Sequence, residues 1–177
     1  MPLDSYDIII LRGAPGVGKS TLSKLMKKEF PEGITIEVDA LRGMIHNVKW
    51  VDKKEHTTAL NATVAMCKEY LKSGYRPMII VDTLGASRMK SFVSSLNALK
   101  IGDSLVSHVT ISLWCRWPDL ENRIMARGDG FKDLNASRII NNEMGNPAFT
   151  PEIVIDTTGR KPVEIVKIVL QELESDE

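Results

Sequence analysis

The stretch that decides the fold reads Gly13-Ala14-Pro15-Gly16-Val17-Gly18-Lys19-Ser20. It follows an apolar run at residues 6–11 and precedes a segment of helical period. Its glycines let successive backbone amides face one centre, where they and the start of the next helix attract phosphate oxygens. Lys19 is expected at the β- and γ-phosphates of a nucleotide, and the Ser20 hydroxyl at Mg²⁺. A turn that is merely rich in glycine does not need Lys followed by Ser, so we predict that residues 13–20 and Thr21 bind a nucleoside triphosphate.

Length and composition favour one soluble domain spanning residues 1–177. Hydrophobic residues make up 43% of the chain, and no window approaches the ~18 consecutive apolar residues of a membrane span. The amino terminus lacks a basic region followed by an apolar stretch, so a cytoplasmic location is expected. The net charge is zero, but residues 171–177 hold four acids and no base. Without this acidic tail, predicted to be solvated and frayed, 23 basic residues face 19 acidic ones.

Apolar, β-branched runs alternate with segments of helical period, which is typical of βαβ units and a parallel sheet. We therefore predict an α/β fold with five parallel strands and helices on both faces. The strands are expected at residues 7–11, 34–38, 78–81, 106–114 and 153–155. The longer helices are expected at residues 53–73, 87–99, 118–127, 134–144 and 162–173, with further helices after the loop and from residue 40.

Polar residues follow the second and third predicted strands, and in an open parallel sheet ligands bind beyond the carboxyl ends of the strands. Asp39 is the candidate general base toward a hydroxyl acceptor, although it could instead cap the next helix. Arg42 could hold an acceptor phosphate or form a surface ion pair. Asp82 is a candidate Mg²⁺ ligand, directly or through water, or else a cap, and Thr83 could assist it on the acceptor side.

Arg123 and Arg127 are four residues apart, so on one helix they project from the same face. They precede a glycine-containing segment, and we predict that they lie at the base of a lid over residues 123–145. There they would stabilise the transferred phosphoryl group. Paired arginines are also common on solvated helix faces, and Lys132 and Arg138 are more consistent with the surface than with the lid's ligand side.

Other side chains carry weaker signals. Residues 157–160 could pass beside a nucleobase, and Trp50 could stack on an acceptor ring. His46, His56 and His108 show no metal-ligand spacing, and each is interpreted as a surface or partly buried, hydrogen-bonded histidine. Cys67 and Cys115 fall in apolar patterns that predict reduced thiols in the core.

With these residues assembled, the chain resembles the P-loop kinase group that includes the bacteriophage-type polynucleotide 5′-hydroxyl kinases. Chloramphenicol phosphotransferase and gluconate kinase are more distant members. The resemblance rests on the loop, on Asp39 with Arg42 three residues later, on residues 80–83 and on the Arg123/Arg127 pair. It implies a three-layer P-loop kinase fold with strand order 2-3-1-4-5 and an arginine-bearing lid. The chain lacks the Asp-x-Asp-x-Thr phosphatase signature of the two-domain end-healing enzymes and is too short to include a ligase.

The resemblance implies transfer of the γ-phosphate of ATP or GTP, with Mg²⁺ as cofactor, to the 5′-hydroxyl end of DNA or RNA. An Asp after the second strand is shared with small-molecule kinases, so a nucleoside, sugar or antibiotic is the alternative acceptor. A second alternative is a nucleotide-dependent switch or assembly ATPase. The Asp39/Arg42 and Arg123/Arg127 pairs argue against it, because a switch needs no acceptor base.

Overall fold

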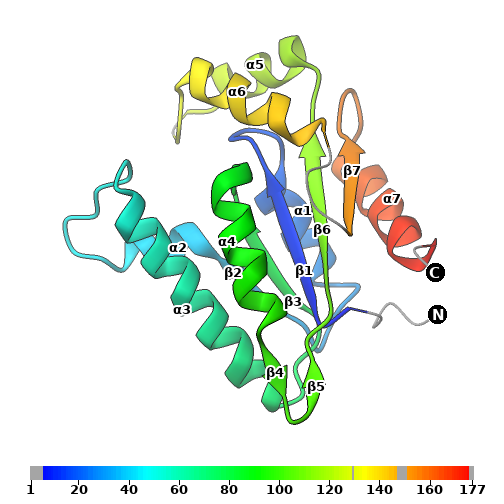
Figure 1. Ribbon diagram of the computed structural model, residues 1–177. Helices are drawn as coiled ribbons and strands as arrows, with labels where there is room; N and C mark the ends of the chain where they lie inside the picture. Colours follow the sequence, from blue (N-terminus) through cyan, green and yellow to red (C-terminus); the bar gives the residue numbers. More distant parts are fainter. Residues whose placement is uncertain (1–5, 129, 147–150, 176–177) are drawn as a thin grey trace.

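The computed structural model describes residues 6–128, 130–146 and 151–175. A single five-stranded sheet organises them, with all strands parallel and in the order β2-β3-β1-β6-β7 (Figure 1). This confirms the predicted α/β fold and strand order. The five strands are β1 (Ile8–Gly13), β2 (Ile34–Glu37), β3 (Met78–Asp82), β6 (His108–Trp114) and β7 (Glu152–Asp156).

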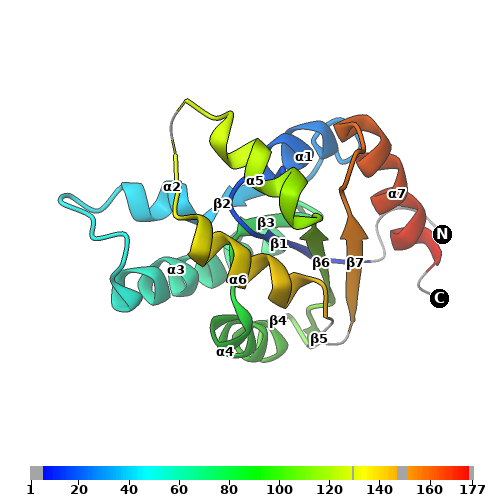
Figure 2. The ribbon, with the colours of Figure 1, turned by 90° about the horizontal axis from the view of Figure 1, so that it is seen from above.

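Helices cover both faces of the sheet, as predicted. They are α1 (Lys19–Met26), α2 (Val38–Gly43), α3 (Lys53–Lys72), α4 (Ala86–Asn97), α5 (Trp117–Met125), α6 (Leu134–Met144) and α7 (Pro162–Ser175). Seen from above, α1 and α7 lie on one side of the sheet, and α3 and α4 lie on the other (Figure 2). Helices α5 and α6 lie across the carboxyl end of β6 (Figure 1).

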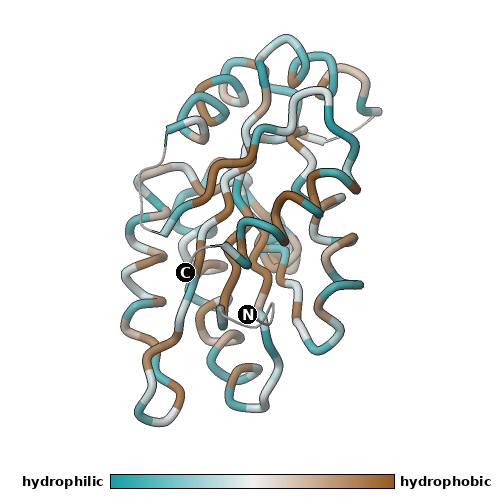
Figure 3. Tube along the Cα trace, turned by 90° about the vertical axis from the view of Figure 1, so that its right-hand side faces the viewer, coloured by the Kyte–Doolittle hydropathy of each residue, from teal (hydrophilic) through white to brown (hydrophobic). Residues whose placement is uncertain are grey.

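The central strand β1 explains why the core has two halves. Successive side chains of a strand point to opposite faces. Accordingly Ile9 and Leu11 pack in the cluster that includes α1 and α7, whereas Ile8 and Ile10 pack in the cluster with α3 and α4. All four side chains are buried, and hydrophobic residues concentrate along the strands (Figure 3). The strand that leads into the phosphate loop is therefore fixed from both sides.

A buried ion pair ties three strands together beside the site. Arg12, near the end of β1, donates to the Ser112 hydroxyl of β6 at 2.7 Å and to Glu152 Oε1 of β7 at 2.5 Å. It also donates to the Leu84 carbonyl after β3 at 3.0 Å. A buried guanidinium is tolerated when it is paired and hydrogen-bonded in this way. The carboxyl edge of the sheet is thus held by polar bonds that the apolar pattern did not predict.

Two boundaries differ from the expectation in ways that matter. Strand β2 ends at Glu37, and α2 begins at Val38, so Asp39 lies inside the first turn of a helix and not at a strand end. The predicted strand at 106–114 begins only at His108. Before it comes an unpredicted antiparallel pair, β4 (Lys100–Ile101) and β5 (Ser104–Leu105), turning at Gly102. Two-residue strands are too short to leave a periodic signal.

The predicted acidic tail is corrected in part. Helix α7 continues to Ser175, and Leu173 is buried in the core, so residues 171–175 are ordered helix and not a frayed end. The last two acids, at positions 176 and 177, lie outside the described residues. Both cysteines are buried free thiols, as predicted, and burial raises the pKa of Cys67 to about 12. No helix in the described part of the chain combines the length and apolar character needed to cross a bilayer.

Candidate active site

A cavity of about 1010 Å³ opens at the carboxyl edge of the sheet. Residues 15–21 of the phosphate loop and α1 line it, together with the starts of α2, α4 and α7, the end of β3, and α5. The predicted residues Asp39, Arg42, Asp82, Thr83, Arg123 and Arg127 also border it. The structure therefore brings the predicted site residues together around one space.

The loop has the backbone shape that its glycines predict. Gly16 and Gly18 have φ values of 87° and 112°, a region that favours glycine. A Cβ atom on Gly16 would lie 2.7 Å from Ile124 Cγ1, so the loop also packs closely against α5. The Ala14 and Val17 side chains are buried, and the polar residues Lys19, Ser20 and Thr21 border the cavity at the end of the loop.

Lys19 opens α1 and lies against the loop. Its ammonium group donates to the Gly13 carbonyl at 2.8 Å and to the Ala14 carbonyl at 3.2 Å. Burial lowers the pKa of Lys19 to about 8, Asp82 and Asp39 partly oppose that shift, and Arg127 adds to it. The charge on this lysine is thus poorly solvated, and a phosphate placed beside it would find a strong electrostatic partner.

Asp39 and Arg42 form a pair on α2. The Asp39 side chain is 64% exposed and borders the cavity, and its Oδ1 lies 3.5 Å from Arg42 Nη1. It makes no capping bond, because the N-cap of α2 is Glu37, whose side chain also makes none. An exposed carboxylate at this position is free to approach a hydroxyl group.

The Arg42 guanidinium is largely enclosed. The residue is 6% exposed, and Nη2 donates to the Trp50 carbonyl at 2.7 Å. The Trp50 ring stacks on the guanidinium at 4.8 Å from the ring centroid. Arg42 Nε has no hydrogen-bond partner in the described chain. Arg42 therefore holds both Asp39 and the loop that carries Trp50, which is only half-buried at the cavity.

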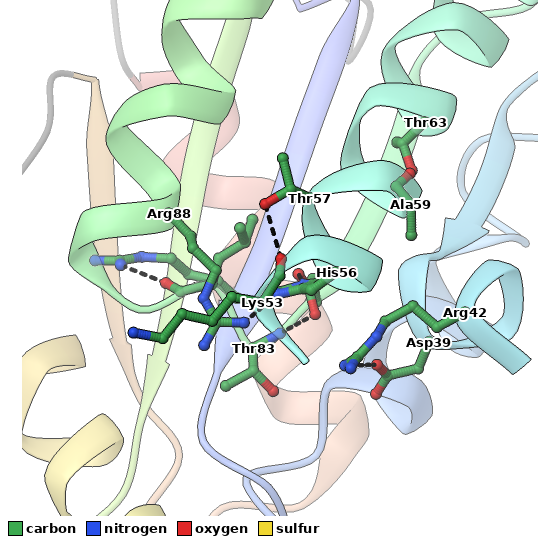
Figure 4. A network of polar contacts seen from close by, with 12 residues as sticks. Asp39, Arg42, Lys53, His56, Thr57, Ala59, Thr63, Thr83 and Arg88 are labelled. Carbon is green, nitrogen blue, oxygen red and sulfur yellow. Dashed lines mark hydrogen bonds and ion pairs between the residues drawn. The ribbon is translucent and has the colours of Figure 1, made fainter. Parts of the chain in front are cut away.

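Asp82 is engaged on both carboxylate oxygens. Oδ1 accepts from the Thr83 amide at 2.8 Å, and Oδ2 lies 2.6 Å from His56 Nε2 of α3. Asp82 is 4% exposed and His56 is 2% exposed. On its other side, His56 Nδ1 contacts Arg88 Nη1 from the first turn of α4 (Figure 4). Sequence reasoning treated His56 as an ordinary satisfied histidine and did not single out Arg88.

The two predicted lid arginines are placed differently. Arg123 donates to the Val17 carbonyl at 3.3 Å and to the Thr157 hydroxyl and carbonyl at 3.1 and 2.7 Å. It thus joins α5 to the phosphate loop and to the turn after β7. Helix α5 ends at Met125, so Arg127 lies beyond it, and the prediction that both arginines project from one helix face is wrong. The Arg127 side chain borders the cavity and makes no hydrogen bond or ion pair with any described residue. Of the two, Arg127 has its donors available for a ligand.

Helix α6 of the predicted lid is anchored. Asn141 bonds both backbone groups of Cys115, accepting from its amide at 3.2 Å and donating to its carbonyl at 2.7 Å. What remains between α5 and α6 is a short connection in which Gly130 and Phe131 border the cavity. Closure of a lid over residues 123–145 stays a prediction, and position 129 lies outside the described residues.

Four other residues that the sequence singled out differ in whether they border the cavity. Lys132 bonds the Gly128 carbonyl, and Arg138 stacks on Trp117, so neither borders the cavity. Thr157 is buried behind Arg123, whereas Arg160 borders the cavity from the turn before α7. A role of residues 157–160 beside a nucleobase stays a prediction.

The donor set agrees with a magnesium ion held mainly by the phosphates of a nucleotide. The exposed Ser20 hydroxyl borders the cavity, which provides the oxygen ligand expected after the loop lysine. Both Asp82 oxygens already accept hydrogen bonds, so a contact through water suits this residue better than direct ligation. In the described ranges, no group of three or more His, Cys, Asp or Glu side chains is arranged to hold a metal ion alone.

Three solved structures with this fold illustrate the comparison. The tunicamycin resistance protein of Deinococcus radiodurans has 20% identity and a TM-score of 0.70, with 95% of both chains covered. A gluconokinase from Sinorhizobium meliloti has 16% identity and a TM-score of 0.69, with 98% of this chain and 94% of that chain covered. A sugar kinase from Janibacter has 15% identity and a TM-score of 0.71, with 97% and 96% covered. At these identities the likeness is one of fold.

Sequence comparison gives the family. No curated protein matches the chain. A family model described as AAA domain matches residues 8–143, which include the phosphate loop, Asp39, Asp82, Arg123 and Arg127. Because this match covers well over half of its length, the chain belongs to that AAA domain family.

Proposed function

We propose that the protein is a kinase that transfers the γ-phosphate of ATP or GTP to a hydroxyl group of a small molecule. The observation that carries this proposal is a shared cavity: the phosphate loop with Lys19 and the exposed Asp39 carboxylate border the same space. Phosphoryl transfer needs a phosphate cradle, cations around the transferred group and a carboxylate that accepts the proton of the attacking hydroxyl.

In the proposed step, the acceptor oxygen attacks the γ-phosphorus and forms a new O–P bond. The bond between the γ-phosphorus and the bridging oxygen breaks, and its electron pair leaves with the nucleoside diphosphate. The hydroxyl proton goes to Asp39, which Arg42 orients. Lys19 and Arg127 stabilise the negative charge on the phosphoryl oxygens, and Arg123 holds the loop in shape.

Magnesium fits this proposal as a ligand of the nucleotide phosphates. Ser20 would bind the ion, and Asp82 would contact it through water. When bound, the ion neutralises charge on the β- and γ-phosphates.

A small acceptor is favoured by the size of the cavity. About 1010 Å³ suffices for a nucleotide and a compact acceptor, being near the upper end of ordinary small-molecule sites. Proteins of the same fold whose names give an acceptor include a gluconokinase, a sugar kinase and a shikimate kinase. These names support a small hydroxyl compound by analogy of fold.

A polynucleotide 5′-hydroxyl end is the second candidate acceptor. The spacing of Asp39 and Arg42 favours it, because it resembles the arrangement in polynucleotide 5′-hydroxyl kinases. A 5′-hydroxyl oligonucleotide assayed beside sugars, nucleosides and antibiotics, each with ATP and GTP, separates the two. Transfer to the oligonucleotide without transfer to any small molecule would overturn the preferred acceptor.

Asp39→Asn tests the kinase itself. Loss of the base should lower kcat for transfer by about 10²- to 10⁴-fold while the affinity for the nucleotide is unchanged. Asp103→Asn, in the turn between β4 and β5, is the matched control and should behave as wild type. If nucleotide hydrolysis without an acceptor is the main activity and Asp39→Asn leaves it intact, a nucleotide-dependent switch replaces the kinase proposal.

A further inference from the structure

The cluster formed by Asp82, His56 and Arg88 is not explained by the phosphoryl transfer step. It joins three elements: the end of β3, the first turn of α3 and the first turn of α4 (Figure 4). Two of its members are almost fully buried, whereas Arg88 is exposed and borders the cavity. The cluster therefore carries a chain of polar contacts from the sheet to the cavity wall.

The hydrogen positions in this chain follow from the partners. A guanidinium has only donors, so His56 Nδ1 must accept from Arg88. The hydrogen of the neutral imidazole is then on Nε2, which donates to the Asp82 carboxylate at 2.6 Å. The Thr83 amide fixes the other Asp82 oxygen. Each group is thus oriented by the one behind it, and Arg88 is the only member at the surface.

The charge of Arg88 at the start of α4 is electrostatically unfavourable unless an anionic ligand binds there. A cation in the first turn of a helix opposes the helix dipole, which favours anions at that end. Within the described ranges, no carboxylate forms an ion pair with Arg88, and its side chain makes only the contact with His56. The amide of Ala86 in the same turn is bonded by Glu143 of α6, so the helix end itself is already occupied.

Arg42 offers a contrast on the other side of the cavity. Its guanidinium is enclosed by Asp39, the Trp50 carbonyl and the Trp50 ring, which leaves little of it to grip a ligand. Arg88, held from behind by His56, presents its remaining donors outward. A planar fork fixed in this way is suited to bidentate recognition of a carboxylate or phosphate.

We propose that Arg88, positioned by His56 and Asp82, binds an anionic group of the acceptor, so that the acceptor is a hydroxyl compound bearing a carboxylate or phosphate. This inference rests on the proposed function and refines it. Arg88 is the residue that selects the acceptor, and His56 is a positioning residue that acts through it. Trp50, half-buried at the same cavity, would cover the apolar part of such a compound.

The test uses matched acceptors that share a hydroxylated skeleton and differ in one group: neutral, carboxylate or phosphate. Wild type should prefer one of the charged members by at least about tenfold in kcat/KM, and the favoured member distinguishes carboxylate from phosphate. Arg88→Gln should raise KM for the charged acceptor about 10- to 100-fold and leave KM for the nucleotide unchanged. Lys90→Gln, an exposed cation two residues further along α4, is the control and should change neither.

A double-mutant cycle tests the positioning role of His56. As a single substitution, His56→Phe should raise KM for the charged acceptor. When it is combined with Arg88→Gln, it should cause no further rise in KM. His56→Gln, which keeps a donor toward Asp82, provides a folded alternative if His56→Phe is unstable. Additive effects on KM would assign His56 to stability alone.

Binding separates this inference from the kinase proposal. With a non-hydrolysable nucleotide analogue bound, calorimetric titration should show tight binding only of the charged compounds, and Arg88→Gln should weaken that binding by about 10- to 100-fold. Equal binding of the neutral compound, or no effect of Arg88→Gln, overturns the inference. Binding of the charged compound without any transfer in wild type contradicts the proposed function and leaves the anion site standing.

Discussion

At the scale of single residues, Lys19 is the group whose charge is most sensitive to pH. Burial beside the loop lowers its pKa to about 8 from the ordinary lysine value of 10.5. Nucleotide phosphates bind the protonated form, so affinity should be full well below pH 8 and fall as pH rises through about 8 and the proton is lost. Binding at pH 8 should also take up protons, because the phosphates favour the charged lysine.

The measurement is KM for ATP between pH 6 and 10, with calorimetry in buffers of different ionisation enthalpy near pH 8. Lys19→Arg keeps a permanent charge and should flatten the profile, even if its absolute affinity is lower. A wild-type KM that is constant up to pH 10, with no proton uptake, would contradict the lowered pKa.

Site residues were predictable where a contiguous sequence motif defines them. They were not predictable where the site depends on contacts between elements that are distant in sequence. The loop residues 13–21, Asp39 and Asp82 were readable because each follows an apolar strand in sequence. The contact of His56 with Asp82 and Arg88 depends on how α3 and α4 pack on β3, which sequence spacing does not fix. One signal was present: His56 precedes Leu60 and Cys67 on the apolar stripe of α3, where a polar ring must find buried partners.

At the scale of elements, the end of α5 at Met125 separates two arginines that looked equivalent in the sequence: Arg123 lies in the helix and Arg127 beyond it. Arg123 is committed to the loop and to Thr157, whereas Arg127 keeps its donors toward the cavity. Arg127→Ala should therefore lower kcat about 10²- to 10³-fold with little change in nucleotide affinity. Arg123→Ala should instead loosen the loop, weaken nucleotide binding and lower the melting temperature, because three hydrogen bonds are lost.

Steady-state kinetics, nucleotide titration and thermal unfolding of both variants distinguish these outcomes. Arg116→Gln, an exposed arginine just before α5, serves as the control. Identical kinetic defects in the two variants would support the interpretation from the sequence, in which both arginines stabilise the transferred phosphoryl group.

Element boundaries show why part of the fold was predictable. Helix α6 begins and ends where the pattern placed it, at Leu134 and Met144, because Asp133 caps it and the apolar period is regular. The end of β2 was placed one residue late, because Val38 suits both a buried strand and the buried side of a helical turn. The β4–β5 pair is held by antiparallel backbone pairing between two-residue strands. Strands this short show no alternation of polar and apolar residues, so the sequence pattern did not predict them.

At the scale of the whole molecule, the sheet edge connects ligand binding to stability. The loop follows β1 and is buttressed by α5 and, through Arg123, by the turn after β7, so a nucleotide there contacts parts of the chain far apart in sequence. A ligand that binds only the folded protein stabilises it by about 2.7 kcal/mol at 100 times its Kd. For a chain of this size, that corresponds to a rise of about 5–10 °C in melting temperature.

Thermal unfolding with a non-hydrolysable ATP or GTP analogue and Mg²⁺ tests this expectation. The shift should vanish in Lys19→Ala at the same nucleotide concentration, because this variant lacks the cation that binds the β- and γ-phosphates. It should persist in Asp39→Asn, because the base acts on the acceptor alone. Lys24→Ala, which removes an exposed lysine at the other end of α1, should leave the shift unchanged. If Lys19→Ala shows the same shift as wild type, the nucleotide binds elsewhere. If Asp39→Asn loses the shift, Asp39 belongs to nucleotide binding, and the mechanism has no acceptor base.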